Sequence, residues 1–585
     1  MFNYRLLPLY VAFGSAFIAN AAAAADFFGG DSDKPKTRTP IKHLIVIIGE
    51  NHTFDNVFGT YQPNRGHTVD NLLSKGIVNA DGSPGPNFAL AAQRQAQNHG
   101  AYSPVPITTT PYATLPQPAT TYATGVPPGV PDARFPADLP NGPFQITKYV
   151  TYDAHTGDPV HRFFQMWQQF DAGKLDLFAW VALTVGTGPQ NNPPLTPGNT
   201  FQGGEALGFY NMKSGDAAIF NQLAQRYAIS DNYHQAIMGG TGANFIAVVT
   251  ADAGFYNQDG VHSVPPANQI ENPNAQAGTN NFYTQDGYAG GSYVNCADAN
   301  QPGVAPIDFY MRSLPYRPFN QGNCAADTYY LLNNYSLGYD YHGTPRALGS
   351  DKFVLPPQTI PTIADALAQK GVSWKWYSGG RHANTAPDDE YCGICDPLTG
   401  FTSIMTSDLK NNLQGMDEFY ADVQSEKTLP SVVFIRPFES KAGHPANAVV
   451  ADYEKFVQDI VNRVQTNRRL WDETAILVTV DEGGGYYDSG YIQTLDFFGD
   501  GTRIPLIAIS PWAKAGHIDH TYADHASIAK FIERNWGLAP LSNRSRDNLP
   551  NPLTRNDPYV PANRPAIGDL MSLFYFDEVH EHDNR

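Results

Sequence analysis

The chain has 585 residues, of which 42% are hydrophobic, so it is long enough for one large α/β domain with insertions or for two or more average domains. Its formal net charge of −18 argues against nucleic acid or an anionic membrane surface as the main partner. The charge does not exclude an anionic substrate, because a bound cation and a few basic groups can reverse the local field.

The N-terminus has the pattern of a secretory signal peptide over residues 1–25. Arg5 supplies the positive charge, residues 6–19 form the apolar core, and residues 20–25 (NAAAAA) form the small-residue cleavage zone. The apolar core is too short for a stable membrane span. We therefore expect a periplasmic or secreted protein, with a linker over 26–40 before the folded domain.

The first predicted strand is the β-branched run IKHLIVIIG (41–49). Buried parallel strands have such continuous apolar sequences. Residues 77–145 are rich in Pro, Thr, Ala and Gly, which neither propagate a helix nor pair in a central strand, so we expect a surface insertion. The spacing of apolar residues then predicts helices at 158–173 and 218–227.

A second irregular insertion is predicted for about 255–350, a segment dense in Asn, Gln, Gly and Tyr. Beyond it, strands alternate with helices, which predicts an α/β fold with a wound, mostly parallel central sheet flanked by helices. The predicted strands are 372–378, 431–437, 475–480 and 503–511, and the predicted helices are 359–371, 449–466 and 525–537. One domain is expected over 41–565, followed by a C-terminal tail at 566–585.

Four cysteines occur in the chain. Cys296 and Cys324 lie in the second insertion, and Cys392 and Cys395 form a CxxC sequence. After a signal peptide, four cysteines more often form structural disulfides than a metal or redox site. Three pairings are open, and we favour Cys296 with Cys324 and Cys392 with Cys395.

Hard oxygen ligands directly follow two of the predicted strands. Glu50 and Asn51 follow the first strand, and Asp481 and Glu482 follow the strand at 475–480. Ligands of open α/β sheets gather at the carboxyl ends of the strands, so these four side chains should meet at one edge. Three carboxylates and an amide would be unfavourable together without a cation, which predicts a divalent metal site.

The sequence GGTGANF (239–245) places Thr241 at the start of a predicted helix. Free backbone N–H groups and the helix dipole favour an alkoxide or a bound phosphate oxygen at such a position. Asn244 lies one turn further on, where its amide is able to donate to the same anion. Alone, this pattern is more often a simple helix cap. Together with the cation site it predicts a phosphoryl-transfer centre.

The segment ENHTFDNVFGTY (50–61) closely resembles the opening motif of the bacterial phospholipase C/acid phosphatase family of phosphoesterases, which belongs to the alkaline-phosphatase-like superfamily. The resemblance continues in the same order through SDNYHQAIMGGTGANF (230–245) and VTVDEGGGYYD (478–488) and covers about 41–540. It implies the superfamily's α/β fold and an enzyme that hydrolyses phosphoric ester bonds. It also implies metal binding by the four oxygen-bearing residues, and Thr241 as a nucleophile that forms a phospho-threonine intermediate.

In the two-zinc alkaline phosphatases of this superfamily, a histidine follows the Asp that corresponds to Asp481. Glu482 stands there in this chain, so we expect one divalent cation. All-oxygen ligation suits Ca²⁺, Mg²⁺ or Mn²⁺, whereas the superfamily's habit favours Zn²⁺, and the identity of the metal stays open. With one cation, a histidine is needed to protonate the leaving oxygen. The leading candidates are His161 and His444, followed by His382 and His525.

Three functions remain open. The favoured one is a metal-dependent acid phosphatase acting on small-molecule phosphate monoesters, because Gly239 and Gly240 precede the nucleophile and the chain ends soon after the last matching segment. The family's phospholipases tend to show Gly-Pro-Thr at this position, so a phospholipase C acting on phospholipid phosphodiesters is the alternative. A secreted, non-catalytic binding protein on the same fold should lack a ligand or the nucleophile, and all five residues are present. The natural substrate, the oligomeric state and the pH optimum stay open.

Overall fold

The computed structural model of the protein describes residues 36–97, 100–118, 131–185, 204–258, 261–274, 291–383 and 385–576. The predicted signal peptide (1–25), most of the predicted linker and the end of the C-terminal tail (577–585) lie outside the described residues. Within the described ranges, no helix is both long and apolar enough to cross a membrane.

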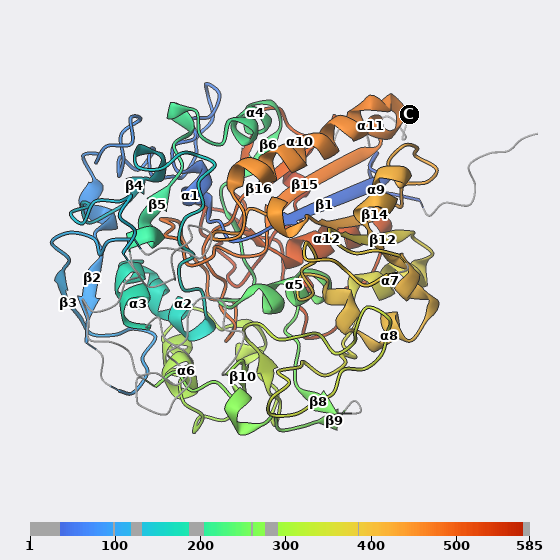
Figure 1. Cartoon of the computed structure of the whole chain (residues 1–585), viewed down its shortest axis with the longest axis horizontal. Helices are drawn as coiled ribbons and strands as arrows, with labels where there is room; N and C mark the ends of the chain where they lie inside the picture. Colours follow the sequence, from blue (N-terminus) through green and yellow to red (C-terminus); the bar gives the residue numbers. More distant parts are fainter. Residues whose placement is uncertain are drawn as a thin grey trace, which may run out of the picture.

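An eight-stranded sheet runs through the centre of the molecule (Figure 1). The strand order is β13-β12-β14-β1-β15-β16-β6-β17, and neighbouring strands are parallel except that β16 runs antiparallel to β15 and to β6. In that order, the strands span Leu413–Gly415, Trp374–Ser378, Val432–Arg436, His43–Gly49, Thr474–Val480, Leu506–Ile509, Ala228–Ser230 and Ile518–Asp519. This sheet confirms the predicted α/β fold with a mostly parallel centre.

The central strands β14, β1 and β15 are buried along their whole length, which explains their continuous apolar sequences. The register of the parallel pair β1 and β15 sets Gly49 opposite Val480. Both strands therefore end at the same level. Glu50 and Asp481, which follow them, leave the sheet next to each other.

Helices cover both faces of the sheet (Figure 1). On one face lie α10 (Val450–Thr466), α11 (Arg468–Asp472) and α4 (Ala218–Arg226). On the other lie α12 (Ala526–Trp536), α5 (Thr241–Thr250) and α7 (Ile363–Lys370). The helices predicted at 218–227, 359–371, 449–466 and 525–537 are thereby confirmed as α4, α7, α10 and α12.

The helix predicted at 158–173 is shorter than expected, because α2 spans only Phe163–Phe170. At its start, Arg162 has extended backbone (φ −97°, ψ 155°), so the helix begins only at Phe163. At its end, Asp171 and Ala172 have φ angles of 42° and 56°, in the left-handed region, which stops the helix. The spacing of the apolar residues did not reveal either boundary.

The two predicted insertions hold mostly short elements in their described parts. The first contains β2 (Arg94–Ala96), β3 (Thr108–Pro111) and β4 (Phe144–Gln145). The second contains β8 (Asn257–Gln258), β9 (Val261–His262), β10 (Tyr293–Val294), β11 (Tyr330–Leu331) and α6 (Val304–Arg312), a helix that was not predicted. The remaining helices and strands are α1 (Phe54–Phe58), α3 (Phe178–Val185), α8 (Thr402–Met405), α9 (Met416–Asp422), β5 (Gly208–Phe209), β7 (Tyr233–His234) and β18 (Ala523–Asp524).

Both favoured disulfides are present in the structure. Cys296 bonds to Cys324 within the second insertion, and Cys392 bonds to Cys395 in the loop after β12. The favoured pairing of the four cysteines is therefore confirmed.

Glu533 of α12 makes the stability of the fold depend on pH. Burial and the neighbouring Asp547 carboxyl raise the pKa of Glu533 from 4.5 to about 9. Between these pH values, Glu533 binds a proton in the folded chain but not in the unfolded chain. The contribution of this proton to the stability of the fold is therefore complete below pH 4.5 and is lost as the pH rises through about 9. One proton corresponds to about 1.4 kcal/mol per pH unit.

We therefore expect Glu533→Gln to flatten the fall in melting temperature between about pH 6 and about pH 9. The measurement is a thermal melting series for the parent and the variant over that range. Curves that stay parallel would show that Glu533 does not bind this proton.

Candidate active site

The ends of β1 and β15 bring the predicted oxygen ligands together. The Asn51 backbone N–H donates to Asp481 Oδ1 at 3.2 Å, and the His52 N–H donates to the carbonyl oxygen of Glu482 at 3.1 Å. Glu50, Asn51, Asp481 and Glu482 are all buried. Four polar side chains from segments about 430 positions apart thus share one buried site at the edge of the sheet, as predicted.

The following three atoms are among the buried side-chain atoms at this site that have no hydrogen-bond partner in the described part of the chain: Asn51 Oδ1, Asp481 Oδ2 and His161 Nε2. Buried polar atoms in native proteins are almost always satisfied by a partner, an ordered water or an ion. Two of the three are oxygens, the donors that Ca²⁺, Mg²⁺ and Mn²⁺ prefer. The residues therefore fit a divalent cation.

The electrostatics of the site point the same way. Burial alone would raise the pKa of Glu50, but the charges of Arg436 and His444 outweigh burial and lower it. Burial and the nearby Glu50 charge raise the pKa of Asp481 well above its ordinary value. A divalent cation would remove this repulsion between buried carboxylates.

The carboxylates are not drawn together as closely as a bound ion would require. A compact ligand group requires three or more His, Cys, Asp or Glu side chains whose ligand atoms all lie within 4.8 Å of one another. Among the described residues, the group that meets this condition is Glu50, Cys392 and Cys395. The two sulfurs form a disulfide, so they are not thiolate ligands. Asp481 lies outside this group, and binding one cation would therefore bring the acidic side chains closer together.

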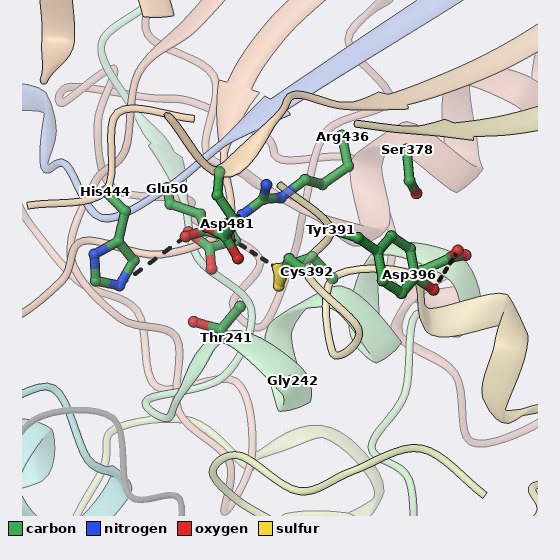
Figure 2. Close-up of a disulfide and its surroundings, with 12 residues drawn as sticks. Glu50, Thr241, Gly242, Ser378, Tyr391, Cys392, Asp396, Arg436, His444 and Asp481 are labelled. Atoms are coloured by element: carbon green, nitrogen blue, oxygen red, sulfur yellow. Dashed lines mark hydrogen bonds and ion pairs between the residues drawn. A yellow bond between two sulfur atoms is a disulfide. The ribbon is translucent and has the colours of Figure 1, made fainter. Parts of the chain in front are cut away.

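Thr241 is the first residue of α5 and lies against this cluster. Its hydroxyl donates to Glu482 Oε1 at 3.0 Å. Figure 2 shows Thr241 facing the carboxylates of Glu50 and Asp481. The turn before it requires glycine, because a Cβ at Gly239 would lie 1.8 Å from the carbonyl oxygen of Leu332. The helix start therefore presents a hydroxyl to the predicted metal site, as the sequence indicated.

Two of the predicted histidines border the site. His161 Nε2 lies 4.0 Å from Glu482 Oε1, and its Nδ1–H donates to the carbonyl of Pro159 at 2.7 Å. Burial lowers the pKa of His161 to about 4. His444 Nε2 lies 4.0 Å from Glu50 Oε2 and 3.0 Å from Asn51 Nδ2. Both imidazoles thus turn Nε2 toward the carboxylates.

A model of the Phosphoesterase family matches residues 41–539 of the chain. The chain belongs to the Phosphoesterase family. This match covers most of the sequence and confirms the resemblance found in the motifs.

Two relatives with different names align with this Phosphoesterase-family chain over part of its length. Hemolytic phospholipase C of Pseudomonas aeruginosa is 26% identical over 258 residues, which are 37% of this chain and 33% of that protein. A probable acid phosphatase of Kluyveromyces lactis is 28% identical over 223 residues, which are 36% of this chain and 49% of that protein. The matched regions thus span a third and about half of these two relatives.

A third relative aligns over nearly the whole chain. Phospholipase C B of Mycobacterium tuberculosis is 22% identical over 597 aligned positions, which cover 96% of this chain and 82% of that protein. A solved structure of a protein in the alkaline phosphatase superfamily from Vibrio parahaemolyticus covers 56% of this chain and 62% of its own, with 12% identity and a TM-score of 0.26.

Three predicted catalytic side chains of the Phosphoesterase-family chain are engaged elsewhere. The Asn244 amide donates to the carbonyls of Ile237 and Gly239, and its Oδ1 accepts from the Ile237 N–H, so it orders the turn before Thr241 and does not face an anion. These bonds give no support to its predicted role as an anion donor. The sequence correctly placed Asn244 one helical turn after Thr241, but it did not reveal that backbone groups bind the Asn244 amide.

The structure also gives His525 and His382 partners outside the four predicted metal ligands. His525 is buried; its Nε2–H donates to the carbonyl of Val480, and its Nδ1 accepts from the Ala236 N–H, so both ring nitrogens have partners. His382 is 41% exposed and pairs with Asp388 at 3.0 Å.

Sequence reasoning missed Arg436, whose Nη2 donates to Glu50 Oε1 at 2.5 Å. A signal was present, because Arg436 is the last residue of the buried strand β14, and a charged residue there lies at the edge where ligands gather. It also missed Asn334, whose Oδ1 accepts the Gly242 N–H at 2.6 Å in the first turn of α5. No local pattern marks Asn334.

Proposed function

We propose that this Phosphoesterase-family protein is an exported, metal-dependent acid phosphatase that hydrolyses phosphomonoesters with Thr241 as nucleophile. The observation that carries the proposal is the Thr241 hydroxyl bonded to Glu482 at a helix N-terminus, beside buried oxygens without partners. Export is supported by the signal-peptide pattern and by two disulfides, which persist in oxidising compartments.

One divalent cation would be held by Glu50, Asn51, Asp481 and Glu482. When bound, it would neutralise phosphate charge and lower the pKa of the Thr241 hydroxyl. Their oxygen donors suit Ca²⁺, Mg²⁺ or Mn²⁺, and the nearby His161 Nε2 would make Zn²⁺ acceptable as well.

The chain's own residues supply the remaining steps. As Thr241 Oγ1 attacks phosphorus, its proton passes to Glu482 Oε1, to which it is already hydrogen-bonded. The bond from phosphorus to the ester oxygen breaks, and the alcohol leaves. The N-terminus of α5 stabilises the negative charge near Thr241. Water then hydrolyses phospho-Thr241, which releases phosphate and restores the hydroxyl.

His444 is the proposed proton donor to the leaving oxygen. His161 is not, because its pKa is about 4 and its ring hydrogen is on Nδ1, bonded to the carbonyl of Pro159, so the Nε2 that faces the site carries no proton above that pH. We expect His444→Gln to lower kcat by about 10²-fold, the usual scale for loss of a general acid. His382→Gln is the matched control, because His382 lies away from the carboxylates, and its kcat should stay within about twofold of the parent. Steady-state kinetics of both variants check this. Equal rates for the two variants would remove His444 from the proposed chemistry.

Phospholipase C activity is the second candidate function. It is supported by the alignment with phospholipase C B, which covers 96% of this chain. The same nucleophile and cation would act on a phosphodiester, and the leaving group would then be a diacylglycerol instead of a simple alcohol.

Parallel assays on p-nitrophenyl phosphate and p-nitrophenyl phosphorylcholine, with and without EDTA, test these functions. We expect the monoester to be the better substrate, activity to be lost in EDTA, and addition of a divalent cation to restore it. A preference for the diester would favour phospholipase C. Hydrolysis of neither substrate would favour a binding protein, and full activity in EDTA would contradict the cation.

A further inference from the structure

Glu50 Oε1 is held by one group from a strand end and one from a loop. Arg436 Nη2 at the end of β14 donates to it at 2.5 Å. Cys395 Sγ, in the loop after β12, lies 2.8 Å from the same oxygen. A sulfur in a disulfide carries no hydrogen, so this second contact is a packing contact that restricts where the carboxylate can move. The other oxygen, Oε2, lies 4.0 Å from His444 Nε2.

Arg436 is itself tightly held. Its side chain is 1% exposed, its Nη1 donates to the carbonyl of Pro437 at 2.7 Å, and its Nη2 also pairs with Glu439 at 3.0 Å. A guanidinium with several fixed partners keeps one orientation. It therefore holds Glu50 in place.

The disulfide loop is braced on both sides of Cys392 and Cys395. Before it, the backbone carbonyl of Glu390 accepts from the Glu439 N–H at 3.0 Å, which ties the loop to the segment after Arg436. After it, Asp396 accepts from Arg381 at 2.5 Å and from the Tyr391 hydroxyl at 2.9 Å. Figure 2 shows Cys392 and Arg436 beside Glu50, with the Tyr391–Asp396 pair on the side of Cys392 that is away from Glu50.

We propose that Arg436 and the Cys392–Cys395 disulfide form a clamp, here called the Glu50 clamp, that positions Glu50 for cation binding. This rests on the proposed function, in which Glu50 is a metal ligand. Loss of a group that orients a metal ligand lowers metal affinity by about 10- to 100-fold. The disulfide is thus a positioning element of the active site as well as a covalent cross-link.

The disulfide is the cleaner half of the clamp to test, because it is uncharged. Removing Arg436 would change both the position of Glu50 and the charge beside the cation, and these effects on affinity oppose each other. Removing the disulfide leaves the charge beside the cation unchanged, and its effect on stability is controlled for below. The chain also offers a matched control in its other disulfide, which joins Cys296 and Cys324 within the second insertion.

The experiment compares the parent with the double variants Cys392→Ser/Cys395→Ser and Cys296→Ser/Cys324→Ser. Both variants are expected to melt at lower temperature than the parent. Titration calorimetry with Mn²⁺ should show affinity weakened about tenfold or more only in the 392/395 variant. Parent-like Mn²⁺ affinity in that variant would overturn the Glu50 clamp. Equal weakening in both variants would also overturn it, because the loss would then reflect general destabilisation.

A second measurement applies if the 392/395 variant does not fold. The folded Cys296→Ser/Cys324→Ser protein keeps only the Cys392–Cys395 disulfide. This protein is treated with a phosphine. The phosphine breaks the S–S bond to give two thiols and is itself oxidised to its oxide, with oxygen from water. Mn²⁺ affinity should fall after this reduction, and unchanged affinity would overturn the clamp.

The outcomes separate the clamp from the proposed function. If the parent protein binds no Mn²⁺, or if Asp481→Asn binds it as well as the parent, the metal site itself is wrong. If the parent binds, Asp481→Asn does not, and the 392/395 variant binds like the parent, only the clamp is wrong.

Discussion

Thr241→Ala is expected to abolish turnover while leaving the cation bound. Loss of a catalytic nucleophile typically lowers kcat by about 10⁴-fold or more. The Thr241 hydroxyl is hydrogen-bonded to Glu482 and lies at the N-terminus of α5, so its removal takes away the attacking atom and leaves the four oxygen-bearing residues in place. The measurements are kcat on p-nitrophenyl phosphate and Mn²⁺ content after dialysis.

Thr241→Ser is the matched control for this variant, because it keeps a hydroxyl at the same position. Activity should remain within about one order of magnitude of the parent. Gly239 and Gly240, which shape the turn, are unchanged in both variants. Full activity in the alanine variant would remove Thr241 as nucleophile. Loss of bound Mn²⁺ in that variant would show that Thr241 mainly holds the site together.

Asp481→Asn is expected to reduce both the metal content and the rate. Asp481 is buried, its Oδ1 accepts from the Asn51 and Glu482 N–H groups, and its Oδ2 has no partner in the described part of the chain. The amide keeps the shape but loses the charge that a divalent cation needs. We expect a loss of about 10²-fold or more in kcat/KM, together with a substoichiometric metal content.

Asp519→Asn is the matched control for Asp481→Asn. Asp519 is also buried, but it lies on β17 at the edge of the sheet, where its carboxylate accepts from Thr521 and Ser572. Its metal content and rate should match those of the parent. Unchanged metal stoichiometry in Asp481→Asn would contradict its assignment as a ligand.

The central strands were predictable because burial on both faces demands apolar residues at every position. The runs that became β1 and β15 show this pattern, and so does the run that became β14. Their carboxyl ends were predictable for the same reason, since the first polar residues after each run mark where the strand leaves the core. Glu50 and Asp481 were found in this way.

Roles that depend on hydrogen-bond partners were not predictable. Asn244 has the right spacing to donate to an anion, yet its amide is used by the carbonyls of the preceding turn. His525 lies within the part of the sequence that resembles the family, yet both of its ring nitrogens are hydrogen-bonded to backbone groups. The type of side chain fixes what it can donate or accept, but only its neighbours decide which bond it makes.

The sequence by itself determined the wound sheet and the polar residues delivered to one edge, because both follow from local burial patterns. It left three disulfide pairings open, and the structure decided among them. Only the tertiary structure decided that Arg436 and Cys395 meet Glu50. These contacts join segments more than 340 positions apart. No local pattern records which loop packs against which, since that choice depends on the register and order of the whole sheet.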